Sequence, residues 1–572
     1  MANTMKLGIN GSAVRYWTNQ SAFKDLRKNG GFYWTATSGD YDTDGDFIPH
    51  DGKTDASGNP SSYTASAGGS MPTGTFARAL LANSLTNLPT PYPSGIYHIL
   101  WDGSGTIDLG SDPDWPSSSG LVAPGDVSFT INTPTAAGIL LDISSAPGGD
   151  YLRNIRVVHD DDLSTYENQP FNQRMLDSLK ELSDSDGGYF RAMNWNYING
   201  DGGNPRWTSG PDEFHLAWRV STSSWDTRVI PAMPQGKIGC SLEYAVSICN
   251  SIDRNLWYCV PHRATSDFIT SAATYIKDNL NSSLSTVVEW SNEFWNGGFY
   301  QQYYCYSGAA DPTVSAQYYG GLSTGPGNGG TGNDTRAANR YGADRTKEAW
   351  DIFYSVFGEA ASTRVIRTIG TQSGNSWQGE RMLEWSGVNS EGAPVSSCDS
   401  ISIAPYFGGS FGRDPIASQI LNDSSSVAQV IASATYDVSA PLGGIRTDVQ
   451  EHKTLADSYG IDLYLYEGGQ HLVGVGAALE NSMYAIFSAC NDDPGMGTLY
   501  GVYLDMLQEE GVKVSCMYRS MGKNSKQTMF GLQQFYGQSI RPKYDAVLAW
   551  LGVQPELFVI INNVGYRINI NS

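Results

Sequence analysis

Short apolar strands alternate with helical segments along most of this 572-residue chain. Runs rich in β-branched and aromatic residues are typical of buried strands, and apolar residues at helical spacing follow all but the first of them. The longest predicted helix, 335–357, carries Ala349, Ile352, Phe353 and Val356 at that spacing. Counted from residues 6–10, the pattern predicts eight strands, which begin near residues 6, 188, 256, 286, 363, 400, 461 and 512.

Eight strands that alternate with helices predict a (β/α)8 TIM barrel, in which the carboxyl ends of the strands meet at one mouth. A doubly wound open sheet would also alternate. No glycine-rich phosphate-binding turn follows the first strand, however, so the barrel is favoured.

A change in composition divides the chain. Between residues 65 and 150, Gly, Pro, Ser and Thr separate short alternating runs, which predicts a small all-β, sandwich-like module. The predicted domains are therefore the start of the barrel (1–64), the inserted module (65–150), the remainder of the barrel (151–552) and a short C-terminal β hairpin (553–572). Packing, carbohydrate binding and assembly remain open as roles of the module.

The charge and composition exclude several partners. A net charge of -22 disfavours binding to nucleic acid or to anionic membranes. No stretch of about 18 apolar residues is present, so we expect no membrane insertion. The 33 tyrosines and 15 tryptophans suit a protein that stacks aromatic rings on sugars, although most such rings belong to cores.

The cysteines and the first residues bear on where the chain folds. Seven cysteines without a CxxC pair argue against a disulfide scaffold and favour folding in a reducing cytoplasm. The start of the chain has no basic segment followed by an apolar run, so we expect no signal peptide. Such a chain acts either inside the cell that makes it or outside that cell, after release by lysis as part of a virus particle.

Two predicted strands end in a carboxylate. Residues 286–296 read TVVEWSNEFWN and residues 461–471 read IDLYLYEGGQH, which places Glu293 and Glu467 where strands leave the core. A general acid and a nucleophile on either side of one bond are the groups that cleave glycosides. For the first run alone, helix capping by Asn292 and Glu293 is an equal alternative.

Other polar residues also lie at the ends of predicted strands. Together with the two carboxylates, the predicted rim of the barrel comprises Asn10, Arg191, His262, Asn292, Glu293, Tyr406, Glu467 and Tyr518. Such a gathering at the carboxyl ends of barrel strands is typical of an active site.

The arrangement resembles clan A of the retaining glycoside hydrolases, in which an Asn-Glu pair ends the fourth strand and a Glu ends the seventh. Asn292-Glu293 and Glu467 match in residue type and strand number. The resemblance implies that Glu293 is the acid/base, that Glu467 is the nucleophile and that Asn292 binds the sugar 2-hydroxyl. It also implies that Arg191 and Tyr406 hold the nucleophile charged and oriented.

The remaining candidates match the clan less specifically. His262 is either a site residue or a packed histidine. Trp295 is a candidate sugar-stacking platform, and Trp34, Trp195 and Trp377 are lesser ones. Where the clan often places a Trp after the eighth strand, this chain has Met517-Tyr518.

Other mechanisms find no support in the sequence. The chain has no HExxH, no phosphate-binding loop, no GxSxG elbow and no metal-type cysteine cluster, so we expect neither cofactor nor metal. Residues 42–46, DTDGD, lack the glycine and glutamate positions of a calcium loop, and a turn is favoured there.

Two functions remain. The first is an endo-acting retaining β-glycosidase that hydrolyses a polysaccharide. The second is a non-catalytic carbohydrate-binding or structural virion protein on a glycosidase-like barrel. Either fits a homo-oligomer or virion assembly through residues 553–572, whose apolar strands are suited to pairing.

Overall fold

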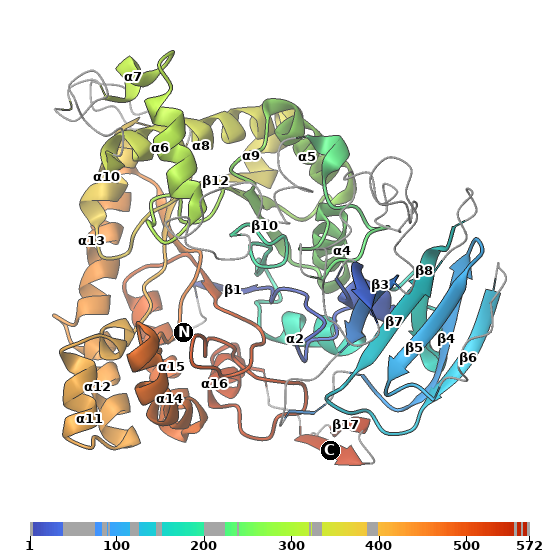
Figure 1. Cartoon of the computed structure of the whole chain (residues 1–572). Coiled ribbons are helices and arrows are strands. Elements are labelled where there is room, and N and C mark those ends of the chain that lie inside the picture. The colour runs from blue at the N-terminus through green and yellow to red at the C-terminus, as the bar shows by residue number, and fades with distance from the viewer. Residues whose placement is uncertain are drawn as a thin grey trace.

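The computed structural model describes most of the chain (Figure 1). The described residues are 4–31, 33–37, 75–82, 88–89, 92–114, 125–144, 151–199, 224–236, 239–319, 322, 334–385, 398–553, 557–561 and 564–568. Residues 42–46 lie outside this part, as does the side chain of Trp34.

Eight parallel strands close into a barrel, which confirms the predicted fold class. In chain order they are β1 (Lys6–Asn10), β9 (Tyr189–Arg191), β10 (Asn255–Val260), β11 (Thr286–Trp290), β12 (Val365–Gly370), β13 (Ser400–Ile403), β14 (Asp462–Leu465) and β15 (Val514–Met517). Each pairs with the next, and β1 closes the ring by pairing with both β9 and β15.

Along each strand, successive side chains point alternately into the barrel interior and outward to the helix layer. On β11, Val287 belongs to the interior cluster, whereas Val288 and Trp290 join the large cluster under the helices. The interior is tightly filled: a Cβ on Gly8 would lie 2.7 Å from the Cys516 sulfur. Glu289 shares the inward face of β11 with Val287, so its carboxylate lies among the barrel's central residues.

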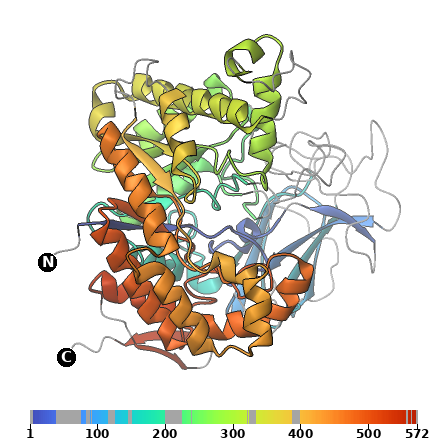
Figure 2. The same ribbon diagram turned by 90° about the vertical axis from the view of Figure 1, so that its left-hand side faces the viewer.

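Helices surround the barrel in the expected order (Figures 1 and 2). The helices that alternate with the barrel strands are α2 (Gln173–Glu181), α4 (Leu242–Ile252), α5 (Ser266–Asn279), α8 (Thr335–Phe357), α10 (Ser376–Trp385), α13 (Gly444–Tyr459), α15 (Pro494–Glu509) and α16 (Pro542–Trp550). The additional helices are α1 (Leu26–Asn29), α6 (Tyr300–Ala310), α7 (Ser315–Tyr319), α9 (Ala361–Arg364), α11 (Ile416–Asn422), α12 (Val427–Ser439) and α14 (Ala477–Asp492).

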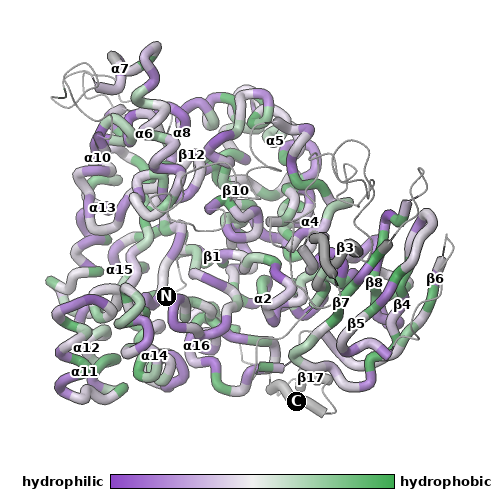
Figure 3. Tube along the Cα trace, in the orientation of Figure 1, coloured by the Kyte–Doolittle hydropathy of each residue, from purple (hydrophilic) through white to green (hydrophobic). Residues whose placement is uncertain are grey.

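The inserted module consists of two small sheets beside the barrel (Figure 1). One sheet pairs β2 (Trp34–Thr37), β3 (Thr75–Ala82), β7 (Ile139–Ser144) and β5 (Thr106–Ser111), and the other pairs β6 (Gly125–Ile131), β4 (Gly95–Asp102) and β8 (Arg153–His159). Hydropathy alternates along these strands, as Figure 3 shows for β4 and β5. Strands of the two sheets thus lie on both sides of the predicted range 65–150.

The module is joined to the barrel through the segment that follows β1. Leu26 of α1 belongs to the module's own apolar cluster. The Asp25 carboxylate accepts hydrogen bonds from the backbone N–H groups of Arg27 and Val157, each at 2.9–3.0 Å. These contacts bind the segment that enters the module to β8, the strand that leaves it.

At the end of the chain, β16 (Leu557–Ile561) pairs antiparallel with β17 (Val564–Ile568). All seven cysteines lie in the described part of the chain, and each is a buried free thiol. Among the described helices, none combines the length and the apolar character needed to cross a bilayer.

Candidate active site

The loop after β11 presents Glu293. Ser291 and Glu293 both adopt left-handed backbone conformations, with φ of 61° and 43°, which non-glycine residues rarely occupy. The Asn296 N–H donates to the Glu293 carbonyl at 2.8 Å and closes the turn. Strained backbone that the surrounding structure enforces is concentrated at functional sites.

Glu467 follows β14 and is only 5% exposed. Its Oε1 accepts a hydrogen bond from Arg191 Nη1 at 2.8 Å, and its Oε2 accepts one from the Tyr406 hydroxyl at 2.7 Å. Burial holds the pKa of Glu467 above its usual value, and Arg191 and Tyr406 offset part of this rise by stabilising the carboxylate. The side chain is thus oriented at both oxygens by groups that favour its ionised form.

Glu293 is half-buried and held differently. Tyr466 Oη donates to its Oε1 at 3.1 Å, and Asn296 Nδ2 donates to its Oε2 at 2.7 Å. Burial, followed by repulsion from the nearby Glu467 carboxylate, raises the pKa of Glu293 to about 7. This carboxyl group is therefore suited to carry a proton near neutral pH.

Arg191 connects the predicted site residues. Its Nη1 also donates to Asn10 Oδ1 at 3.1 Å, and its Nη2 donates to Asn292 Oδ1 at 2.8 Å. The strand register explains these contacts, because Asn10 and Arg191 are direct partners in the β1–β9 pair. The structure thereby brings Asn10, Arg191, Asn292, Glu467 and Tyr406 into one hydrogen-bonded group.

Asn292 is fixed from its other side as well. Its Nδ2 donates to Asn199 Oδ1 at 3.0 Å, and Gln301 on α6 donates both to that oxygen and to the Asn292 carbonyl. Asn292 is 1% exposed. Its amide orientation is therefore set by its neighbours, with the oxygen toward Arg191.

His262 and the candidate tryptophans differ in how far they are buried. His262 is 2% exposed and packs against the rings of Tyr300 and Tyr304 on α6, with centroids 6.0 and 5.3 Å away. Trp295 is half-buried against the main core. Of the lesser candidates, Trp195 is fully buried in the core and is not a surface platform, whereas Trp377 is 55% exposed.

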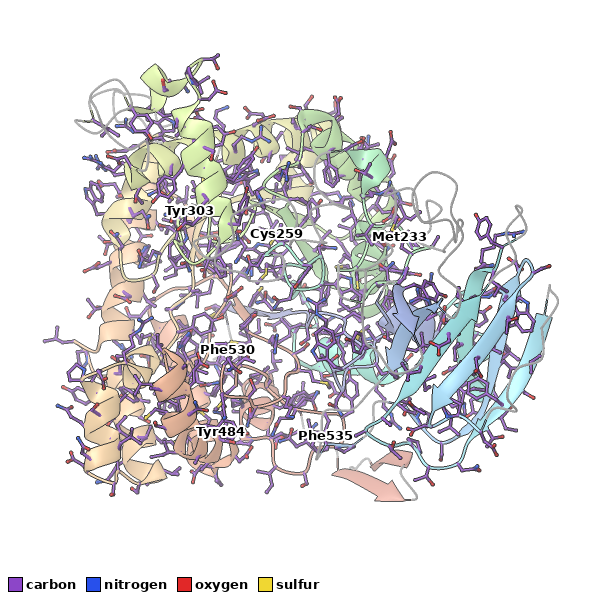
Figure 4. All side chains as sticks on the ribbon, viewed as in Figure 1. Met233, Cys259, Tyr303, Tyr484, Phe530 and Phe535 are labelled. Atoms are coloured by element: carbon purple, nitrogen blue, oxygen red, sulfur yellow. The ribbon has the colours of Figure 1, made fainter. Side chains whose placement is uncertain are left out.

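An aromatic cluster adjoins the Glu467 side of the site. Phe530, on the loop after β15, lies with its ring centroid 5.8 Å from Tyr406, 5.5 Å from Tyr518 and 5.2 Å from His471. Figure 4 labels Phe530 on this loop. Phe530 and Tyr518 are both half-buried, so part of each ring is accessible.

Three neighbours of the carboxylates were not predicted: Glu289, Tyr466 and Asn296. Glu289 forms a paired contact with Arg191, with oxygens 2.8–3.0 Å from Nε and Nη2. A charged residue in the otherwise apolar strand 286–290 was the available signal for it. Tyr466 and Asn296 carry no comparable signal, because their importance depends on contacts that form only in the folded chain.

The chain shows little similarity to known proteins at the level of sequence. No protein-family model matches the chain. No curated protein matches it either. Similar solved structures include the GH5-4 broad specificity endoglucanase from Clostridium acetobutylicum, at 12% identity over 66% of this chain and 89% of that one, with a TM-score of 0.33.

A second similar structure is the β-glycosidase from the hyperthermophile Thermosphaera aggregans, at 11% identity over 68% of this chain and 86% of that one, with a TM-score of 0.34. A third is a calcium-binding mutant of Bacteroides uniformis β-glucuronidase 2, at 12% identity over 85% of this chain and 48% of that one, with a TM-score of 0.33. At these levels of similarity, the function has to be argued from the site.

Proposed function

We propose that this protein is a glycoside hydrolase that cleaves a polysaccharide by the retaining, two-carboxylate mechanism. The observation that carries the proposal is the contrast between Glu293 and Glu467. Arg191 and Tyr406 bind the oxygens of Glu467, whereas Glu293 has a pKa raised to about 7. Two neighbouring carboxyl groups, one bonded to a cation and the other bonded to neutral donors, can supply the nucleophile and the acid of such a reaction.

In the first step, a Glu467 oxygen bonds to the anomeric carbon while the bond from that carbon to the glycosidic oxygen breaks. Glu293 gives its proton to the leaving oxygen. In the second step, Glu293 removes a proton from water, the water oxygen bonds to the anomeric carbon, and the bond to Glu467 breaks. Both carboxyl groups return to their starting state, and the sugar keeps its anomeric configuration.

The accessible aromatic rings fit a carbohydrate substrate. Phe530 and Tyr518 adjoin Tyr406 and thus the nucleophile, and Trp295 lies two residues beyond the acid. Rings next to the nucleophile, and one close to the acid along the chain, suit stacking of sugar units. These rings support an endo-acting enzyme, which binds several sugar units of a polymer.

The test is the Glu467→Gln variant, assayed with the wild-type protein on a panel of soluble β-glucans, xylans and mannans. We expect wild-type hydrolysis of at least one polymer and a loss of roughly 10³-fold or more in the variant, with polymer binding retained. Glu359→Gln is the matched control, because Glu359 is an exposed glutamate in the short turn that follows α8. Its turnover should equal that of the wild type.

Product stereochemistry tests the retaining step. Proton NMR of freshly released sugar should show the anomeric configuration of the substrate before mutarotation occurs. Inverted product, or unchanged turnover in Glu467→Gln, would overturn the proposed mechanism. Polymer binding without hydrolysis by the wild type would favour the non-catalytic, carbohydrate-binding alternative.

A further inference from the structure

A third carboxylate, Glu289, is buried beneath the two that the proposed mechanism uses. It is 2% exposed and points into the barrel from β11, four residues before Glu293. Its Oε2 accepts hydrogen bonds from Arg191 Nε at 3.0 Å and from Trp257 Nε1 at 2.7 Å. The Cys259 thiol lies 3.3 Å from the same oxygen. Figure 4 labels Cys259 inside the barrel.

The register of the strands creates this arrangement. Arg191 is the direct partner of Trp257 in the β9–β10 pair, and Cys259 is the direct partner of Glu289 in the β10–β11 pair. All of these side chains face the interior, so Glu289 and Arg191 meet across β10. A buried ion pair of this kind is costly unless its remaining polar atoms are also bonded, and here they are.

The hydrogen bonds of Arg191 account for every donor of its guanidinium group. Nε and one N–H of Nη2 face Glu289, and the other N–H of Nη2 faces Asn292. The two N–H groups of Nη1 face Asn10 and Glu467. Because a guanidinium has five donors in a fixed plane, this group has one orientation in which all of them are used.

The positive charge of Arg191 is thus shared between two carboxylates, those of Glu289 and Glu467. The paired contact with Glu289 is the stronger geometry, and Glu467 receives a single hydrogen bond from Nη1. The rings of Trp257 and Tyr466 lie 5.8 and 5.0 Å from the guanidinium carbon and separate it from water. When one carboxylate is removed from such a buried site, the positive charge of Arg191 stabilises the ionised form of the other carboxylate more strongly.

We propose that Glu289 is a positioning residue, which holds Arg191 in its fixed orientation and balances part of its charge so that Glu467 is anchored yet remains a basic nucleophile. This inference rests on the proposed function. Arg191 also lowers the pKa of Glu293. Glu289 therefore helps to keep the acid protonated, because it offsets the same positive charge.

The other titratable groups around Glu289 stay neutral over the working pH range. Burial raises the pKa of the thiols and of the phenol that face it, which are Cys259 on β10, Tyr466 after β14 and Cys516 on β15. The charges that matter are then those of Arg191, Glu289, Glu467 and, when it ionises, Glu293. Removal of the Glu289 charge should therefore act on both carboxyl groups in the same direction.

The test is a carbon-13 NMR titration of the glutamate side-chain carboxyl carbons in the full chain. Glu293→Gln and Glu467→Gln variants assign the two signals. In Glu289→Gln, we expect the pKa values of Glu467 and Glu293 to fall, with a shift of about one unit at Glu467. Cys259→Ala is the matched control, because it removes a contact to the same oxygen without removing a charge, and both pKa values should be unchanged.

Glu289→Asp provides a second variant. It keeps the charge but retracts the carboxylate by one methylene, so the paired contact with Arg191 is weakened. We expect a smaller fall in the pKa of Glu467 in this variant. Glu289→Asp provides the test if Glu289→Gln does not fold. An unchanged pKa of Glu467 in a folded variant would overturn the inference and indicate that Glu289 serves only to pair Arg191.

The titration needs no substrate, so it separates the two proposals. A fall in both pKa values in a protein that hydrolyses no glycan would support the role of Glu289 in setting the charge of the site and reject the proposed function. Hydrolysis that depends on Glu467, with unchanged pKa values in Glu289→Gln, would support the function and reject this inference. Where both hold, the pH optimum of the variant should move to lower pH.

Discussion

The Tyr466 hydroxyl donates a hydrogen bond to Glu293 Oε1 at 3.1 Å, across the barrel mouth from β14 to the loop after β11. The next residue in the chain is Glu467, which is bonded to Arg191 and Tyr406. Two consecutive residues thus have different roles: Tyr466 contacts the proposed acid, and Glu467 is the proposed nucleophile. Any movement of the chain at this point would change the position of both groups together.

Removal of the Tyr466 hydroxyl should make Glu293 a weaker acid. The hydrogen bonds from Tyr466 and Asn296 both lower the pKa of Glu293, because they stabilise its ionised form. In Tyr466→Phe or Asn296→Ala, we expect the basic limb of the kcat/KM profile to move above its wild-type position near pH 7 by about half a unit to one unit.

The matched control for this change is Tyr484→Phe, since Tyr484 is a half-buried tyrosine of α14 that Figure 4 shows away from the barrel centre. Its pH profile should match that of the wild type. A basic limb that moved to lower pH in Tyr466→Phe would contradict the assignment of Glu293 as the acid.

The raised pKa of Glu293 also predicts how stability depends on pH. The folded state holds this proton up to a pH of about 7, whereas an unfolded glutamate releases it near 4.5. The group's contribution to stability is therefore complete below about pH 4.5 and is lost as the pH rises to about 7. By this linkage, ionisation of Glu293 should cost about 3 kcal/mol of unfolding free energy at pH 8.

The Glu293→Gln variant has no ionisable group at this position, so it should not lose this stability as the pH rises. Urea unfolding at pH 5 and pH 8 should show that the variant loses less stability than the wild type between the two conditions. Equal pH dependence in the two proteins would show that Glu293 ionises normally in the folded chain.

Tyr406→Phe should weaken the nucleophile's support. The hydroxyl donates to Glu467 Oε2 at 2.7 Å, and a hydrogen bond to a charged group contributes about 1.5–3 kcal/mol. We expect kcat/KM to fall roughly 10- to 100-fold. The acid limb of its pH profile should move upward, because loss of this donor raises the pKa of Glu467.

Tyr436→Phe is a suitable control for the Tyr406 variant, because Tyr436 on α12 is 72% exposed. A Tyr406→Phe enzyme with lower kcat/KM but an unmoved acid limb would mean that the hydroxyl binds substrate and does not act on Glu467.

Phe530 should act in substrate binding alone. Its ring adjoins Tyr406 and Tyr518, and loss of a stacking ring costs about 1–1.5 kcal/mol, so we expect KM to rise roughly tenfold in Phe530→Ala. The pH profile should not change. Phe535→Ala, a change of another half-buried phenylalanine on the same loop, should leave KM unaltered, and an equal effect of the two variants would contradict a specific platform.

Helix α8 illustrates what local sequence could predict. Residues 335–357 were predicted as a helix, and the structure has α8 at Thr335–Phe357. Ala349 and Phe353 are fully buried, as their spacing indicates. The helix begins where the Asp334 side chain caps it and ends at Gly358, whose φ is 58°. Such features depend on neighbours in the chain, so a sequence reveals them directly.

Glu289 illustrates what local sequence could not predict. Within 286–296 its charge makes it unusual for a buried strand, but this signal does not identify a partner, and only Glu293 lies at the strand's end, where a site is expected. Its contact with Arg191 joins residues 98 positions apart and depends on the register of β9, β10 and β11. No local pattern encodes that register.

The sequence by itself determined the barrel, the strand ends that carry Glu293 and Glu467, and the residues that could surround them, because hydrophobic periodicity and strand order are properties of the linear chain. Only the tertiary structure decided which of these groups share Arg191, which hydroxyl binds which carboxylate, and which tryptophan is buried. The physical reason is that pKa values and hydrogen bonds depend on burial and on distances of about 3 Å between groups far apart in sequence, and closure of the barrel sets both.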